Sequence, residues 1–150
     1  MHAIEGYINQ TREAAFDEDA AAAEVAHEQG WPEDWLNSKA SMFFPSFSVG
    51  LDWEELYSDR YINISVASPE ALLAMKVNAS RPGRDVQDIA NLLAICNVTN
   101  LEEISQIMNK YYPGDGISEK AERLLMPIFE QGVPAVPARP PNPVLGFDLI

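Results

Sequence analysis

The sequence predicts an α+β domain that is predominantly helical, with about five helices and two or three short strands. Two observations lead to this class. Alanine-rich and amphipathic segments, whose apolar side chains recur three and four residues apart, fill most of the 150 residues. Residues 61–67 instead alternate apolar and polar side chains, as a half-buried strand does. Capping residues and turns rich in proline and glycine separate these segments.

The N-terminal segment predicts a long helix over residues 3–29, because it is rich in alanine and no proline interrupts it. Gly30 is expected to end this helix. Residues 31–37 then predict a short helix with a proline in its first turn. Trp31 and Trp35 would lie on one side of this short helix, and we expect the pair to anchor it to the core.

The middle of the chain is mixed and contains the expected strands. A short strand is expected at residues 47–51, and the clearest strand is expected at residues 61–67. Between them, Glu54 and Glu55 have two interpretations. They could be paired acids of a catalytic site, or they could lie on a solvated face, which is the simpler interpretation.

Further helices are predicted after residue 67, each from a capping residue and an apolar stripe. Ser68 is expected to cap the first of them, with a proline at the first helical position and Glu70 near the positive end of the helix dipole. Asn100 and Glu103 form a capping-box pattern, and Ser118 is the expected cap of the last helix. These predicted helices cover residues 68–80, 84–97, 100–112 and 119–130.

The composition changes after residue 131. Five prolines fall within residues 133–143, which predicts an extended or polyproline-like segment. The last residues, 144–150, are largely apolar, and the sequence leaves open whether they dock on the domain, dock on another subunit or stay flexible. We therefore expect one domain over residues 1–131 and a proline-rich tail over residues 132–150.

The composition also argues against several classes of function. The formal net charge is −13, and a field of this sign opposes binding to nucleic-acid backbones and to anionic membranes. No apolar run is long enough to span a bilayer, and the start of the chain lacks the features of a secretory signal. The single cysteine, Cys96, excludes an internal disulfide and is expected to be a small buried apolar side chain. We expect a cytoplasmic, bacterial-type protein.

Three basic side chains stand out in this acidic chain, because they fall within nine residues and two aspartates follow them. Lys76 lies within a predicted helix, and Arg81 and Arg84 follow across a tight turn. Asp85 and Asp88 are three residues apart, so they would be neighbours on one face of the next helix. In one interpretation the bases bind the phosphates of a nucleotide and the aspartates orient them. In the other, the aspartates are N-terminal helix acids and the bases are their surface partners.

The same region resembles a bacterial nucleotidyltransferase-like family, that of the abortive-infection and type IV toxin nucleotidyltransferases. Two runs carry the resemblance: Ala-Ser-Pro-Glu-x-Leu-Leu-Ala-Met-Lys at residues 67–76, and Arg-x-x-Arg-Asp-x-x-Asp-Ile-x-x-Leu-Leu at residues 81–93. A strand precedes them and a Tyr-Tyr-Pro turn follows. Residues 21–37 resemble the linking region of the family. In all, the resemblance covers roughly residues 12–130.

The resemblance implies a nucleotide-binding role for residues in the helical half of the family's site. The other half of that site is missing here. Family members carry a Gly-Gly or Gly-Ser turn and then an Asp-x-Asp pair that binds magnesium, as metal-assisted phosphoryl transfer requires. This chain has neither dipeptide, and its Asp-x-Asp at residues 17–19 lies in an alanine-rich helical context. The candidate nucleotide-binding residues are Lys76, Arg81, Arg84, Asp85 and Asp88.

The leading hypothesis is therefore a non-catalytic interaction or regulatory protein derived from a nucleotidyltransferase-like fold, without a cofactor. The resemblance adds a toxin–antitoxin or mobile-element setting. The alternative is an enzyme, a nucleotidyltransferase that uses Mg²⁺ and a nucleoside triphosphate and is completed by a partner chain or by unusual ligands. A zinc site is not expected, because His2 and His27 are far apart and lack metal-ligating neighbours.

A partner is also expected. Loss of the catalytic strands would leave a sheet edge and an apolar face exposed. We therefore expect either a homodimer or a complex with another protein. The tail over residues 132–150 is a candidate to cover this surface.

Overall fold

The computed structural model describes residues 18–36, 39–45, 50–58, 60 and 63–138. These residues form five α-helices, one 3₁₀ helix and a two-stranded antiparallel sheet, which confirms the predicted helical α+β class. In chain order the elements are α1 (Glu18–Gln29), η1 (Lys39–Phe43), β1 (Trp53–Ser58), β2 (Asn63–Ala67), α2 (Pro69–Ala79), α3 (Val86–Ile95), α4 (Leu101–Tyr111) and α5 (Glu119–Gln131).

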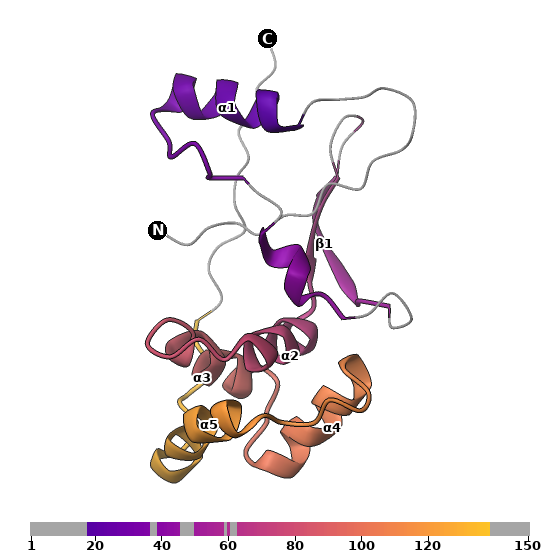
Figure 1. Ribbon diagram of the computed structural model, residues 1–150, viewed down its shortest axis with the longest axis vertical. Helices are drawn as coiled ribbons and strands as arrows, with labels where there is room; N and C mark the ends of the chain where they lie inside the picture. The colour runs from indigo at the N-terminus through magenta and orange to yellow at the C-terminus, as the bar shows by residue number, and fades with distance from the viewer. Residues whose placement is uncertain (1–17, 37–38, 46–49, 59, 61–62, 139–150) are drawn as a thin grey trace.

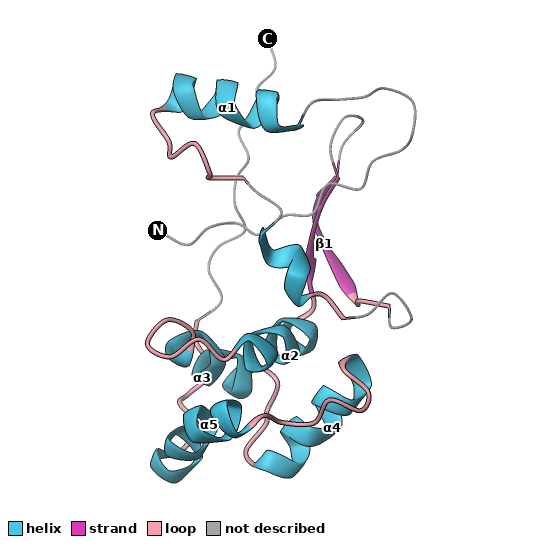
Figure 2. Ribbon diagram, in the orientation of Figure 1, coloured by secondary structure: helices cyan, strands magenta, loops and turns pink. Residues whose placement is uncertain are grey.

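Helices α2 to α5 gather at one end of the molecule, and α1 lies at the opposite end (Figure 1). The β1–β2 hairpin and η1 lie between them, as Figure 2 shows by the type of element. None of the helices in the described ranges is both long and apolar enough to cross a membrane. The core lies among α2 to α5, and its largest fully buried apolar and aromatic side chains are Leu73, Val77, Ile89, Leu93, Ile104, Met108, Tyr111 and Leu125.

Side-chain caps determine where α2, α4 and α5 begin. Ser68 Oγ accepts a hydrogen bond from Ala71 N at 3.3 Å, and Ser118 makes the equivalent bond at the start of α5. At α4, Asn100 Oδ1 accepts a hydrogen bond from Glu103 N at 3.0 Å. Each bond satisfies a backbone donor that the helix itself leaves unpaired. The predicted helices after residue 67 are confirmed, with ends that differ by one or two residues.

The first predicted helix is confirmed over Glu18–Gln29, and residues 3–17 of that prediction lie outside the described residues. Gly30 ends the helix as expected. Its φ is 65°, a left-handed conformation that glycine adopts without strain. The N–H of Trp31 then donates to Ala26 O at 2.9 Å, which is the long hydrogen bond of a Schellman motif.

The short helix expected after Gly30 is wrong over residues 31–36, which form an irregular turn. Trp35 Nε1 donates to Ala22 O at 2.9 Å, so the turn folds back against α1 instead of continuing as a helix. Trp31 and Trp35 meet edge to face, with ring centroids 5.0 Å apart. Trp31 remains 46% exposed, so the pair does not anchor this segment in the main core.

β1 and β2 form an antiparallel hairpin in which Trp53 lies opposite Ala67, with a bulge between Glu55 and Tyr57. The strand expected at residues 61–67 is confirmed over Asn63–Ala67, and residues 61 and 62 lie outside the described residues. All residues of β1 except Tyr57 are exposed, so it does not show the apolar alternation of a half-buried strand.

The earlier strand, expected at residues 47–51, is not found at Gly50 and Leu51, and residues 47–49 lie outside the described residues. The strand in this part of the chain is β1 instead. Glu54 and Glu55 lie on β1 with exposed side chains, and Glu55 Oε2 accepts a hydrogen bond from Asn63 Nδ2 at 3.0 Å. Both glutamates therefore lie on a solvated face, as the simpler interpretation predicted.

A polar contact joins the hairpin to the helices. Lys110 Nζ on α4 donates to Asp52 Oδ2 at 3.2 Å and to Glu70 Oε2 at 2.7 Å. The hydroxyl of buried Tyr111 donates to Asp52 Oδ2 at 3.0 Å, and the Ser68 N–H donates to Asp52 O at 2.7 Å. Burial raises the pKa of Tyr111, so its hydroxyl stays a donor at neutral pH. Asp52 therefore connects the start of β1 to α2 and α4.

The next tyrosine attaches η1. The Tyr112 hydroxyl donates a hydrogen bond to Phe43 O at the end of η1. Burial raises the pKa of Tyr112 to about 12, so this hydroxyl also keeps its proton at neutral pH. Two adjacent tyrosines of the α4 end thus hold two different elements against the helices.

We expect Tyr111→Phe to lower the free energy of unfolding by about 1 kcal/mol, because it removes one hydrogen-bond donor and keeps the ring in the core. The loss should be concentrated in the hairpin that Asp52 attaches. Amide hydrogen exchange measured by NMR should therefore become faster in β1 and β2 than in the wild type.

Tyr112→Phe is the matched control, because it removes the neighbouring hydroxyl that bonds to Phe43 instead of Asp52. It should accelerate exchange in η1 and leave the hairpin unchanged. Unchanged hairpin exchange in Tyr111→Phe would show that this hydroxyl does not hold the hairpin.

Candidate functional site

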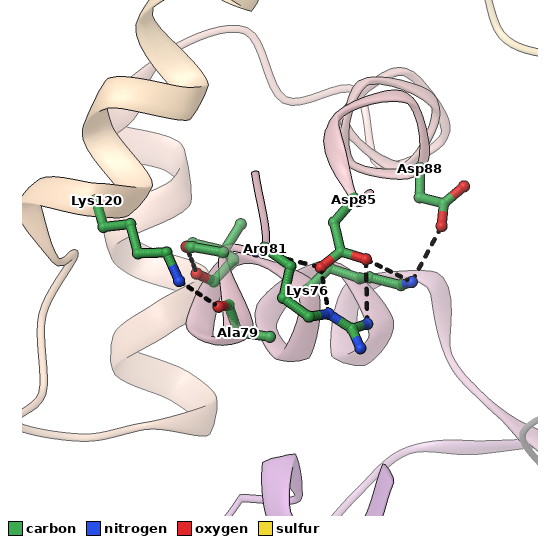
Figure 3. A network of polar contacts seen from close by, with 8 residues as sticks. Lys76, Ala79, Arg81, Asp85, Asp88 and Lys120 are labelled. Carbon is green, nitrogen blue, oxygen red and sulfur yellow. Dashed lines mark hydrogen bonds and ion pairs between the residues drawn. The ribbon is translucent and has the colours of Figure 1, made fainter. Parts of the chain in front are cut away.

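The candidate residues lie where α2, the following turn and α3 meet. Lys76 is in the second half of α2, Arg81 is in the turn, and Asp85 immediately precedes α3. Asp88 lies in the first turn of α3. Figure 3 shows the four side chains converging, with the bases of α2 and the turn facing the acids of α3. We call Lys76, Arg81, Asp85 and Asp88 the Asp85 cluster.

A compact turn brings these side chains together. Ser80 ends α2 with a φ of 42°, and its buried hydroxyl donates to Val77 O. Gly83 also has a positive φ, 75°. Arg81 O then accepts hydrogen bonds from Arg84 N at 3.3 Å and from Asp85 N at 3.1 Å. The Arg-Pro-Gly break that the sequence predicts therefore reverses the chain within a few residues and places α3 against α2.

Asp85 is the centre of the cluster, because its side chain is completely buried. Arg81 binds it with a two-pronged contact, Nε to Oδ2 at 2.8 Å and Nη2 to Oδ1 at 3.1 Å. Arg81 N donates to Oδ2 at 3.3 Å, and Lys76 Nζ donates to Oδ1 at 3.2 Å. Asp85 occupies the N-cap position of α3 but makes no side-chain cap bond. Both carboxylate oxygens instead accept hydrogen bonds from Lys76 or Arg81.

Lys76 bridges the two acids of the cluster. Its Nζ lies 3.2 Å from Asp85 Oδ1 and 3.0 Å from Asp88 Oδ2. The Lys76 side chain is 21% exposed and the Asp88 side chain 38% exposed, so the Asp88 contact lies at the surface and the Asp85 contact inside. The cluster therefore extends from the protein interior to solvent along α2 and α3.

Burial and hydrogen bonding shift the pKa values of Asp85 and Lys76 in opposite directions. Burial acts to raise the pKa of Asp85, but hydrogen bonds from Arg81 and Lys76 outweigh it and hold the pKa below its usual value. Burial acts to lower the pKa of Lys76, but hydrogen bonds to Asp88 and Asp85 outweigh it and the pKa is raised. Both groups are therefore charged at neutral pH.

Arg84 is not part of this cluster, although the sequence groups it with the others. Its side chain is exposed, and no ion pair of Arg84 is found among the described residues. Arg81, in contrast, also lies over the Phe43 ring of η1, 5.7 Å from the ring centroid. The structure thus brings together four of the five predicted residues.

Two further contacts could not be predicted from the sequence pattern. Lys120 Nζ at the start of α5 donates to Ala79 O at the end of α2, at 3.2 Å (Figure 3). This lysine lies 41 residues from its partner, so local spacing gives no signal for it. The Asp52–Lys110–Tyr111 contact is also formed by residues far apart in the chain, and it was not predicted.

The described residues do not form a metal centre. No group of three or more His, Cys, Asp or Glu side chains within them is placed to hold a metal ion. Cys96 is half-buried rather than fully buried, and burial raises the pKa of its thiol, so it is not an activated nucleophile. Residues 17–19 with the Asp-x-Asp sequence begin outside the described part of the chain.

Comparison of the chain with protein-family models, with curated proteins and with solved structures finds no match.

Asp85→Asn should lower the free energy of unfolding at pH 7 by about 3 kcal/mol, because it leaves two partly buried cations facing a neutral amide. The cost should depend on pH. The folded-state pKa of Asp85 lies below the usual 3.8, so its contribution is present above that value. It is lost as the pH falls from about 5 through the folded-state pKa. Urea unfolding at a series of pH values should show the wild type and the variant converging in acid.

Asp88→Asn is the matched control, because it removes the same charge from a side chain that is 38% exposed and bonds to Lys76. We expect it to cost about 1 kcal/mol or less. Equal losses in the two variants would contradict the central position of Asp85.

Proposed function

We propose that the chain is a non-catalytic interaction or regulatory protein in which the Asp85 cluster holds α2 and α3 together. The observation that carries the proposal is the buried Asp85 carboxylate, whose two oxygens take up Lys76 and Arg81. Descent from a nucleotidyltransferase-like protein, with a toxin–antitoxin or mobile-element setting, is part of the proposal. That part rests on the resemblance of residues 67–93.

The bases of the cluster are poorly placed to bind phosphate. A phosphate held by Lys76 and Arg81 would have to displace Asp85 from them. Breaking a buried ion pair in this way costs about 3–5 kcal/mol, because the remaining carboxylate is left buried without a cation. The phosphate would also approach two carboxylates of its own charge sign, Asp85 and Asp88. Repulsion between unit charges 4 Å apart is about 4 kcal/mol near a protein surface.

The acids are equally poorly placed to hold Mg²⁺. Magnesium takes oxygen ligands and keeps several bound waters, so its site must open to solvent. Asp85 is completely buried and both its oxygens already accept hydrogen bonds. Asp88 is the one carboxylate of the cluster with a solvent-exposed surface. A single accessible carboxylate falls short of the paired acids that metal-assisted phosphoryl transfer uses.

Exposed apolar side chains support a binding role. Trp53 is 40% exposed and Leu56 is 51% exposed on β1, in a hairpin whose first strand is almost entirely solvent-facing. Trp31 is similarly exposed after α1. A two-stranded hairpin is marginally stable by itself, and a partner that covers Trp53 and Leu56 would remove their apolar surface from water.

We expect no saturable binding when each nucleoside triphosphate is titrated with Mg²⁺ into the full chain in a calorimeter. The reason is that the positive charges of Lys76 and Arg81 are already neutralised by Asp85 and Asp88. Saturable binding would favour the alternative, a nucleotidyltransferase site completed by another chain or by unusual ligands.

Two variants make a positive result interpretable. Lys76→Ala removes a base of the Asp85 cluster, and Lys120→Ala removes a lysine that also contacts α2 but bonds to a backbone carbonyl. Binding that is lost in Lys76→Ala and kept in Lys120→Ala, with both variants folded by circular dichroism, would overturn the proposal.

A further inference from the structure

After α5 the chain continues as a segment without helix or strand that contains two prolines. Residues 132–138 form neither helix nor strand, and Val133 packs against the core at their base. All side chains from Pro134 to residue 138 are exposed, and Val136 is 64% exposed. Pro134 and Pro137 are three residues apart, which is one turn of a polyproline II helix. In that conformation both prolines lie on one side, the arrangement that aromatic-lined grooves bind.

The charge of this region differs from that of the rest of the chain. Residues 132–143 contain one basic side chain and no acidic one, in a chain whose net charge is −13. The basic residue is Arg139, which lies outside the described residues and completes the sequence pattern Pro-x-x-Pro-x-Arg. A proline-rich segment with a cation beside it is complementary to an aromatic surface with carboxylates around it.

A surface of that chemistry follows α1 in the same chain. Trp31 and Trp35 pack edge to face there, and the Trp35 indole is fixed by its bond to Ala22 O at 2.9 Å. The Trp31 side chain remains 46% exposed. Glu28 and Glu33 are exposed beside this pair in the sequence, and residues 28–36 contain three acidic and no basic side chains.

We propose that residues 133–138 of one copy bind the Trp31–Trp35 surface of a second copy. In Figure 1 the described end of this segment (yellow) lies in the half of the molecule that holds α2 to α5, whereas the turn with the two tryptophans (indigo) lies with α1 in the other half. The described part of the segment therefore does not contact the tryptophan pair of its own copy. Two copies can exchange segments reciprocally, which gives a closed two-fold dimer.

This inference rests on the proposed function in one respect, which is that the chain binds a protein partner. It does not depend on descent from a nucleotidyltransferase or on the absence of nucleotide binding. The calorimetric titration can therefore fail while the dimer is found, and the dimer can be absent while the titration gives the expected result.

Sedimentation equilibrium of the full chain over a wide concentration range tests the proposal. At an ionic strength of about 0.15 M, electrostatic repulsion between two copies of this acidic chain is screened beyond roughly 8 Å. We expect a reversible monomer–dimer equilibrium. The double variant Pro134→Ala/Pro137→Ala and the single variant Trp31→Ala should each weaken dimerisation at least about tenfold, because each removes one side of both contacts. Pro113→Ala, at an exposed proline after α4, is the control and should leave it unchanged.

Mixing the two defective variants gives the sharpest result. The proline variant keeps its tryptophan surface and Trp31→Ala keeps its proline segment, so a mixed dimer regains one of the two contacts. The mixture should therefore associate more strongly than either variant alone. A chain that stays monomeric at all concentrations, a dimer that both variants leave intact, or a mixture no stronger than its components would overturn the proposal.

Discussion

A carboxylate that is removed from water must be compensated by cations and hydrogen-bond donors, and Asp85 imposes this requirement on the helical half of the molecule. Its side chain is completely buried at the start of α3, and Lys76 and Arg81 supply the compensation from α2 and the adjoining turn. A buried ion pair of this kind adds little net stability compared with apolar packing, but losing one partner is costly. The cluster joins the end of α2 and the following turn to the start of α3, and its acids neutralise the bases that a phosphate would need.

The elements around the helices are attached to them by contacts from the ends of α2 and α4 and from the turn after α2. Arg81 lies over Phe43 of η1, and Tyr112 donates to the carbonyl of the same residue. Tyr111 and Lys110 hold Asp52 at the start of the hairpin. The apolar core itself lies among α2 to α5. The hairpin is thus attached by directional bonds at Asp52 and by Ala67, which is buried in the core at the end of β2.

Much of the helical half could be predicted from the sequence because its signals are local. Ser68, Asn100 and Ser118 cap helices within three residues of themselves, and the members of the Asp85 cluster fall within residues 76–88. Spacing could not show that Asp85 is buried or that Arg84 is exposed, because burial depends on tertiary packing. The Asp52–Tyr111 bond joins residues 59 apart. β1 was missed because exposed glutamates interrupt its apolar pattern.

Asp85 is a buried carboxylate whose charge is neutralised by Lys76 and Arg81, and its pKa is held below the usual value. The most direct measurement is a pH titration of its carboxyl carbon by NMR, repeated with inorganic triphosphate present. We predict that Asp85 titrates below the usual 3.8, and that neither its signal nor the Lys76 ammonium signal moves when triphosphate is added. An Asp85 pKa at or above the usual value, or saturable shifts of both signals with triphosphate, would contradict this account.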